Sequence, residues 1–167
     1  MGEVRNEIDG STVEYDFFEP IEGVLVPLLT ALFERHWREI RFGPCIQGAV
    51  YELTLSAPAR VSMLDGYLTV ESGAWHLHLC VGEHRGTTME ARQVRRAAKS
   101  AFFRSRSVTC SGGSYGLRLW NGAGEQMITV FFPSPWLDDD LRLRKEPDWS
   151  RLALWRELRA AYANVTD

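Results

Sequence analysis

Trp75-His76-Leu77-His78-Leu79-Cys80 is the stretch that decides the fold, because apolar and potential donor side chains alternate strictly along it. Alternation with a period of two is typical of a β-strand whose two faces differ. One face is wholly apolar and is predicted to pack against a core. The other face carries two histidines and a cysteine, His76, His78 and Cys80. We therefore predict a strand over residues 74–81 at or next to the centre of a sheet.

The segments before this strand carry turn signals and further alternation. Asp65-Gly66 and Ser72-Gly73 are tight-turn sequences, and residues 67–71 alternate between them. Residues 51–55 alternate as well. Three strands joined by short turns predict an antiparallel meander.

The remaining segments predict two more strands and three helices. Strands are expected at 115–120 and 126–132, on either side of a hairpin turn at 121–124. Apolar spacings of three and four predict helices over 23–40 and 87–104.

The two ends of the chain are predicted to differ in structure. Asp148 or Ser150 is predicted to cap a last helix, whose apolar residues run to Tyr162. Residues 1–20 are expected to form an irregular arm. We predict an α+β fold, with helices packed on an antiparallel sheet of about five strands, in one domain over 1–167.

Composition places the chain among ordinary globular proteins. Of its 167 residues, 45% are hydrophobic and 25% charged, and the net charge is −3. This balance gives no general reason to expect nucleic-acid binding. No apolar run approaches the length of a membrane span. Three cysteines and no export signal favour a cytoplasmic protein with free thiols, and the oligomeric state is left open.

The histidine cluster is the candidate site. Three of the four histidines fall within nine residues, and two imidazoles two positions apart on a strand can bind one metal ion. We take His76 and His78 as the core metal ligands. Glu83, His84 and Cys80 follow as further ligands, and Glu83 and His84 also as acid/base groups. Imidazoles with a carboxylate suit a divalent transition metal (Zn, Fe, Ni or Cu), and a thiolate shifts the preference toward Zn or Cu.

Simpler interpretations stay open beside this one. Histidines on a strand face often hydrogen-bond to neighbours without any metal, and Cys80 alone is typical of a small buried hydrophobe. His36 is expected at the surface of the first helix. The basic residues of segment 92–104 are expected to form a solvated helix face, although the start of that helix could favour an anionic substrate near the site. Trp120 and Trp136 could line a pocket for a flat ligand.

The order of these pieces resembles the stay-green proteins, magnesium dechelatases that remove magnesium from chlorophyll, and their bacterial relatives. The resemblance rests on Phe42-Gly43-Pro44-Cys45-Ile46, on His76-Leu77-His78-Leu79-Cys80-Val81-Gly82, on the helix after it, and on the strand pair that ends at Phe132. It covers about half of the chain, and Leu79-Cys80 stands where that family leads us to expect a further histidine. The resemblance implies a tetrapyrrole-sized pocket and a site lined by histidines and acids that exchanges protons for a metal.

Our leading hypothesis is a small metal-binding protein, an enzyme that uses the His-x-His strand as its metal site and acts on a small-molecule substrate. The first alternative is a metal-free acid/base site that acts on, or binds, a metallated tetrapyrrole. The second is a non-catalytic binding or accessory protein. The sequence leaves the reaction and the substrate open.

Overall fold

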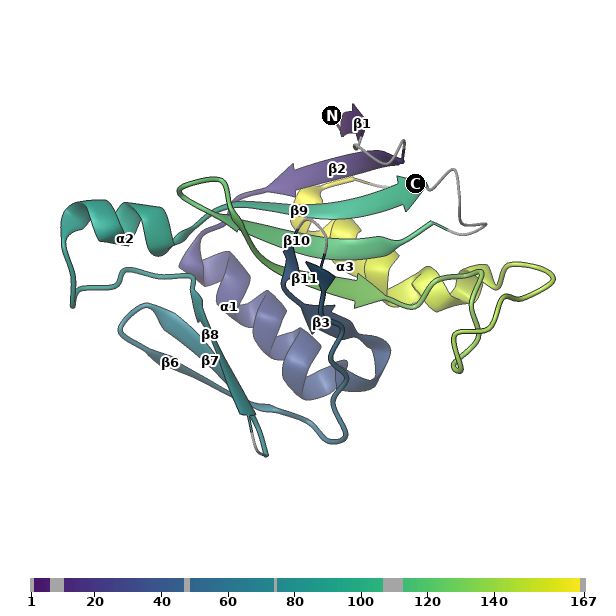
Figure 1. Ribbon diagram of the computed structural model, residues 1–167, viewed down its shortest axis with the longest axis horizontal. Coiled ribbons are helices and arrows are strands. Elements are labelled where there is room, and N and C mark those ends of the chain that lie inside the picture. The colour runs from purple at the N-terminus through teal and green to yellow at the C-terminus, as the bar shows by residue number, and fades with distance from the viewer. Residues whose placement is uncertain (1, 7–10, 47–48, 74, 107–112, 166–167) are drawn as a thin grey trace. The chain divides into compact units, whose positions relative to one another are not determined.

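The computed structural model describes residues 2–6, 11–46, 49–73, 75–106 and 113–165. They form antiparallel sheets with helices packed on them, which confirms the predicted α+β class (Figure 1). The chain divides into two compact units, which we describe separately. Unit 1 comprises residues 1–18, 101–117 and 130–167, and unit 2 comprises residues 19–100 and 118–129.

The largest sheet has six strands in the hydrogen-bonded order β1-β2-β9-β10-β11-β3, and only two of the five predicted strands belong to it. Its strands are β1 (Glu3–Asn6), β2 (Thr12–Phe18), β9 (Ala97–Arg106), β10 (Tyr115–Asn121), β11 (Gln126–Phe132) and β3 (Arg41–Gly43). The predicted strands over 115–120 and 126–132 are confirmed, together with the turn between them.

Residues 3–6 and 12–18 form strands, so the irregular arm predicted for 1–20 is wrong over these segments. Strands β1 and β2 pair antiparallel, with Glu3 opposite Tyr15. In β2 the side chains of Val13 and Tyr15 are buried. Segment 12–18 alternates between apolar and polar residues, so a strand signal was present there.

The C-terminal helix anchors unit 1. It comprises the 3-10 turn η3 (Trp149–Leu152) and the helix α3 (Ala153–Ala163), and Asp148 caps it as expected, by accepting a hydrogen bond from the Ser150 backbone N–H. Helix α3 packs against β2, where the buried Arg159 Nε donates to Asp16 Oδ2 at 2.7 Å.

Unit 2 contains the first helix, as predicted. Helix α1 (Glu22–Thr30) continues through the π-helical turn η1 (Ala31–Arg35) and the 3-10 turn η2 (Trp37–Glu39). Its apolar stripe is fully buried, at Leu25, Leu28, Leu29, Leu32 and Phe33. A two-stranded ribbon, β4 (Cys45–Ile46) with β5 (Ala49–Val50), follows. The strand predicted over 51–55 is reduced to a single bridge between Leu53 and Phe42.

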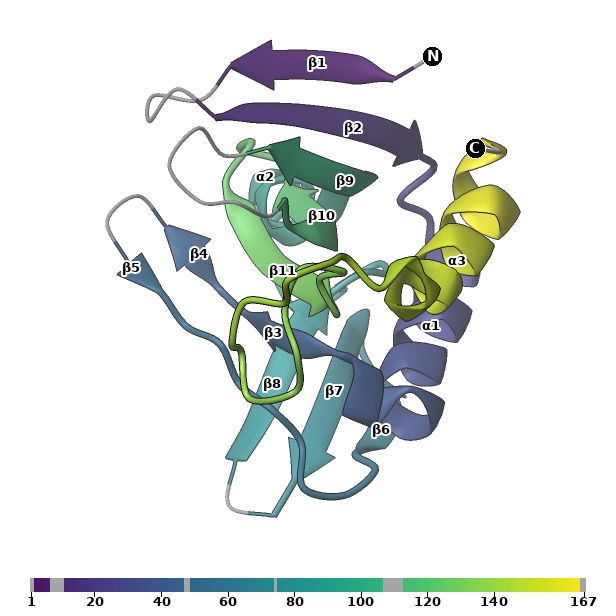
Figure 2. The same cartoon turned by 90° about the vertical axis from the view of Figure 1, so that its right-hand side faces the viewer.

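An antiparallel meander is found as a separate three-stranded sheet in unit 2 (Figure 2), of β6 (Arg60–Leu64), β7 (Tyr67–Ser72) and β8 (Trp75–Cys80) in the order β6-β7-β8. Its second and third strands are the predicted ones, whereas its first is β6 and not the predicted segment 51–55. Its apolar face is buried at Leu68, Val70 and Leu79, and Leu77 is half-buried. Strand β8 lies at the edge of this three-stranded sheet, next to its central strand β7, where the prediction had allowed a position at or next to the centre.

The helix predicted over 87–104 is only partly formed. Helix α2 (Met89–Arg95) is capped by Thr88, and the chain then continues as β9. Residues 97–101 favour a helix by composition. They instead begin β9, the strand that lies between β2 and β10 in the sheet, and bury Ala97 and Ala101, and this tertiary context outweighs the local preference.

Among the helices of the described residues, none combines the length and the apolar character needed to cross a membrane.

Candidate functional site

His76 and His78 lie together on β8, as the alternation predicted. Their ring centroids are 4.8 Å apart, and both residues are exposed. His78 is further fixed by Thr69 on the neighbouring strand, because its Nδ1 lies 2.8 Å from the Thr69 hydroxyl. The sheet therefore brings two imidazoles side by side on one face.

The structure does not complete a metal centre around this pair. Over the described part of the chain, no three His, Cys, Asp or Glu side chains lie close enough together to hold a metal ion. The predicted set of His76, His78, His84, Glu83 and Cys80 is therefore not gathered at one point.

Cys80 and Glu83, two of the predicted metal ligands, have environments that involve no metal ligation. Cys80 is buried, and its Sγ lies 3.8 Å from the carbonyl oxygen of Gly82. Burial raises the pKa of the Cys80 thiol, while a hydrogen bond with Tyr67 acts in the opposite direction. This is the small buried hydrophobe foreseen as the simpler interpretation. Glu83 is exposed and forms an ion pair with Arg85 at 3.8 Å.

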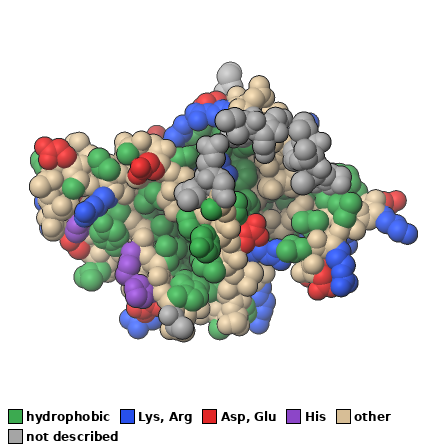
Figure 3. Space-filling view, in the orientation of Figure 1, with side chains coloured by type: hydrophobic (Ala, Val, Ile, Leu, Met, Phe, Trp, Pro, Cys, Tyr) green, Lys and Arg blue, Asp and Glu red, His purple; other side chains and the backbone are tan. Residues whose placement is uncertain are grey.

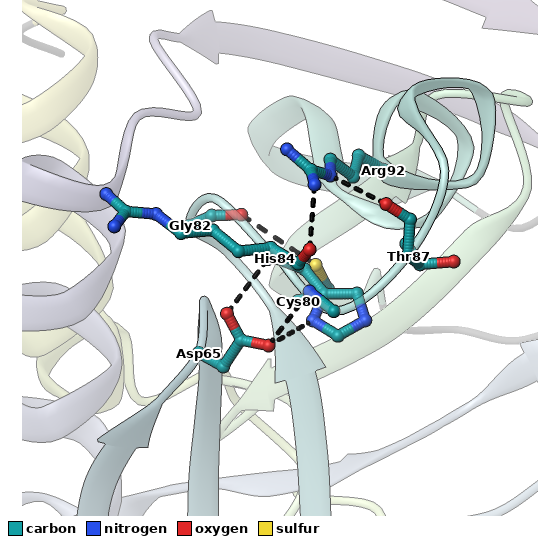
Figure 4. A network of polar contacts seen from close by, with 8 residues as sticks. Asp65, Cys80, Gly82, His84, Thr87 and Arg92 are labelled. Atoms are coloured by element: carbon teal, nitrogen blue, oxygen red, sulfur yellow. Dashed lines mark hydrogen bonds and ion pairs between the residues drawn. The ribbon is translucent and has the colours of Figure 1, made fainter.

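His84 belongs to a different arrangement, which Figure 4 shows from close by. Its Nδ1 lies 2.8 Å from Oδ2 of Asp65, in the turn between β6 and β7. The His84 side chain is 15% exposed, so the ring is held in place but can still be reached. No other hydrogen bond to this ring is formed within the described residues, and Nε2 points away from Asp65 (Figure 4).

Backbone donors hold the Asp65 carboxylate. Oδ1 accepts a hydrogen bond from the Arg85 N–H at 2.8 Å, and Oδ2 accepts one from the Gly86 N–H at 3.3 Å. The Arg85 N–H is the largest cause of the lowered pKa of Asp65, and contact with His84 lowers that pKa further. The carboxylate is thus charged at neutral pH and favours the tautomer of His84 that carries its proton on Nδ1.

Two glycines make room for this arrangement. Gly66 has a φ of +80°, and a Cβ there would lie 2.6 Å from the Glu83 carbonyl carbon. The Gly66 carbonyl accepts hydrogen bonds from Val81 and Gly82, which fix the chain just before His84. At Gly86 a Cβ would lie 3.1 Å from Cε1 of His84, so the bare glycine keeps one edge of the imidazole uncovered.

His84 and the exposed pair share one face of the sheet. Tyr67 lies opposite Cys80 in the register, on the same face as Thr69 and His78. The Tyr67 ring meets the His84 ring edge-on, with centroids 5.0 Å apart. We call this surface the histidine face, made up of Tyr67, Thr69, His76, His78 and His84. Histidine side chains also reach the surface beside apolar ones in Figure 3.

Other residues singled out in the sequence lie elsewhere. His36 pairs with Glu39 at 3.1 Å. The basic residues of 92–104 do not form one helix face, because Arg92 donates to the Thr87 and Arg85 carbonyls while Arg104 lies in β9 and pairs with Glu14. Trp120 packs under the Lys99 ammonium, 5.6 Å from its ring centroid.

A cavity in unit 1 was not foreseen as a site. It has a volume of about 710 Å³, and its walls combine aromatic and arginine side chains. Trp136, proposed from the sequence to line a pocket, is one of its lining residues. The others come from three separate segments of the chain, and no motif in the sequence links them.

Comparison with known proteins places the chain in a family and a fold. A family model described as "Family of unknown function (DUF7676)" matches residues 2–164. No curated protein matches the sequence. Among solved structures, the heme-binding protein ChuX is similar with a TM-score of 0.57 and 11% identity, over 88% of this chain and 76% of that one.

Two larger proteins are similar over part of their length. ChuS, a heme oxygenase of E. coli, matches with a TM-score of 0.54 and 15% identity, over 89% of this chain and 36% of its own. PhuS, a heme-binding protein of Pseudomonas aeruginosa, matches with a TM-score of 0.55 and 18% identity, over 89% of this chain and 34% of its own. At these identities the likeness establishes the fold, and the chain spans about a third of the length of each of these two proteins.

Proposed function

We propose that this chain, which belongs to the family of unknown function DUF7676, binds a metallated tetrapyrrole such as heme on the histidine face of unit 2. The observation that carries the proposal is the pairing of His84 Nδ1 with the Asp65 carboxylate at 2.8 Å, which leaves Nε2 available. The proteins of similar fold that bind heme support the choice of ligand.

The donor chemistry of the site fits this ligand. Iron in a tetrapyrrole has its four in-plane positions filled and accepts an imidazole at an axial one. A single well-oriented histidine therefore suffices, where an isolated transition-metal ion needs three or four protein ligands. His84 supplies that imidazole, and the Asp65 carboxylate holds its orientation through the contact with Nδ1.

The surroundings of His84 suit a flat ring. Gly86 leaves the imidazole edge uncovered, since a Cβ there would already lie 3.1 Å from the ring. Tyr67 supports the imidazole from its edge. Beyond it, His76 and His78 present exposed rings on the same face, against which a planar apolar ligand can pack.

Titration with iron protoporphyrin, followed by its absorption spectrum, tests the proposal. The wild-type chain is expected to bind one equivalent with the spectrum of histidine-ligated iron. His84→Ala should lose that spectrum and at least about tenfold in affinity, which corresponds to about 1.4 kcal/mol. His36→Ala is the matched control, because its imidazole also pairs with a carboxylate but lies outside the histidine face. A His84→Ala spectrum identical to that of wild type would refute the role of His84.

A second function is favoured by the exposed pair His76 and His78. Removal of a divalent metal from a tetrapyrrole delivers two protons to the ring nitrogens as the ion leaves. Two solvent-accessible imidazoles with centroids 4.8 Å apart are suited to supply them. Incubation with magnesium or zinc porphyrin distinguishes the two functions. Metal-free porphyrin that appears with wild type but not with His76→Ala/His78→Ala indicates dechelation, whereas an unchanged metalloporphyrin indicates binding alone.

A further inference from the structure

The side chains of His76 and His78 lean toward one another on β8. Neighbouring residues on one face of a strand lie about 6.5–7 Å apart along the chain. The centroids of these two imidazoles are only 4.8 Å apart, and both residues are exposed. Their planes are inclined at 58°, so the rings do not stack in parallel. The two imidazoles therefore approach each other above the sheet, where solvent and solutes reach them.

This separation matches that of two imidazoles bound to one metal ion. A divalent transition metal lies about 2.0–2.1 Å from each ligating nitrogen. With each ring centroid about 1.2 Å behind its nitrogen, two ligands at an angle of about 90–110° have centroids about 4.5–5.2 Å apart. The observed 4.8 Å lies inside this range. The pair is thus already spaced for a shared ion.

A buried hydroxyl group orients one of the two rings. Thr69 lies opposite His78 in the strand register and is 9% exposed. Its hydroxyl oxygen is 2.8 Å from Nδ1 of His78. Metal-binding histidines are usually held in this way, through the ring nitrogen that does not bind the ion. The contact leaves Nε2 of His78 as the nitrogen that faces a metal.

The charge beside the pair favours a cation. Glu71 lies opposite His76 in the register, and its side chain is on the same face of the sheet. Its carboxylate forms an ion pair with Arg60 at 3.7 Å, but the two side chains are 47% and 79% exposed, and such pairs are weak. Glu71 also stands between Arg60 and the histidines in the register. The nearest charged side chain in this row of the sheet is therefore negative.

We propose that His76 and His78 together bind one divalent transition-metal ion, with water in its other positions. Over the described residues no third donor side chain joins the pair, so the ion keeps positions that exchange with solvent. Imidazole suits Zn²⁺, Ni²⁺ and Cu²⁺, whereas Mg²⁺ and Ca²⁺ prefer oxygen ligands. This site does not involve His84 and needs no tetrapyrrole.

Calorimetric titration of the untagged chain with Ni²⁺ tests the proposal. Ni²⁺ is the probe because the thiolates of the cysteines prefer Zn²⁺ and Cu⁺. Wild type is expected to bind one equivalent, which an excess of Mg²⁺ does not displace. His76→Asn and His78→Asn should each weaken Ni²⁺ binding at least about tenfold, since one imidazole cannot chelate an ion. Glu71→Gln should weaken it less, because its charge acts without ligation.

Two further variants are the matched controls. His36→Asn and His84→Asn each remove an imidazole that pairs with a carboxylate, and both should bind Ni²⁺ as wild type does. His76 and His78 are exposed, so their replacement leaves the fold intact.

The proposal is overturned if wild type binds no Ni²⁺ at about 1 mM, a concentration that detects even a weak site. It is overturned equally if His76→Asn/His78→Asn binds Ni²⁺ as tightly as wild type, or if His84→Asn loses the ion, which would place it elsewhere. Binding of iron protoporphyrin through His84 can succeed or fail independently of these results, because the two sites share no ligand.

Discussion

The Nδ1 atom of His84 lies 2.8 Å from Oδ2 of Asp65, although nineteen positions separate the two residues in the chain. The same carboxylate accepts the backbone N–H groups of Arg85 and Gly86. One aspartate in a β-turn thus orders both the backbone and the side chain of the segment that carries the histidine. His84 is thus oriented by a carboxylate that is itself held by two backbone N–H groups.

Asp65→Asn should therefore weaken iron-porphyrin binding while His84 remains in place. An asparagine keeps the size of the side chain but loses the charge that supports the imidazole. Loss of a carboxylate that holds a metal-binding histidine in place costs about 10–100-fold in metal affinity. Titration of the variant with iron protoporphyrin measures the effect. Asp148→Asn is the control, because that carboxylate is also held by hydrogen bonds but caps η3 in unit 1.

Lowering the pH should break the contacts of the Asp65 carboxylate once that group is protonated. The pKa of Asp65 is lowered in the folded chain, chiefly by the Arg85 N–H. A lowered pKa means that the stabilisation is fully present above the unfolded value of about 3.9 and is lost as the pH falls through the folded value. Titration of the Asp65 carboxyl carbon by NMR should give a midpoint below that of an unstructured aspartate. A midpoint at or above the ordinary value would show that the backbone contacts do not form in solution.

The two faces of β8 should respond to mutation in opposite ways. Leu79→Ala should cost about 2–5 kcal/mol in unfolding free energy because Leu79 is 2% exposed, and Leu77→Ala should cost less because Leu77 is only half-buried. His76→Ala should lie within about 0.5 kcal/mol of wild type, as expected for an exposed residue. Urea unfolding of the three variants checks the order, and a His76→Ala cost equal to that of Leu79→Ala would contradict it.

The buried ion pair of unit 1 should be sensitive to the loss of one partner. Arg159 and Asp16 are 6% and 9% exposed, so Arg159→Met leaves a buried carboxylate without its cation. Such losses cost about 3–5 kcal/mol. Arg60→Met removes an exposed pair with Glu71 and should cost less than about 1 kcal/mol. Thermal melts of both variants test the difference, and equal shifts would mean that burial does not govern the cost.

The strands of the hairpins were predictable because their signals are local. Alternation in 67–72, 75–80, 115–121 and 126–132 depends only on which faces a strand presents, and turn residues marked their ends. The secondary-structure predictions failed where contacts with distant strands determine the conformation. Residues 97–101 favour a helix in isolation, but they begin β9, a strand that lies between β2 and β10 in the sheet.

The features of the candidate site also fall into those that local sequence predicts and those that depend on tertiary contacts. The sequence by itself determined the clustering of His76, His78 and His84 and the division of β8 into a histidine side and an apolar side, because both are properties of adjacent residues. Only the tertiary structure decided that His84 pairs with Asp65 and that no third predicted ligand joins His76 and His78 in one metal-binding group. It alone also gathered Arg106, Trp136 and Arg156 around one cavity. Side chains far apart in the chain meet only once the hydrophobic faces have packed, and no local pattern records which of them that packing brings together.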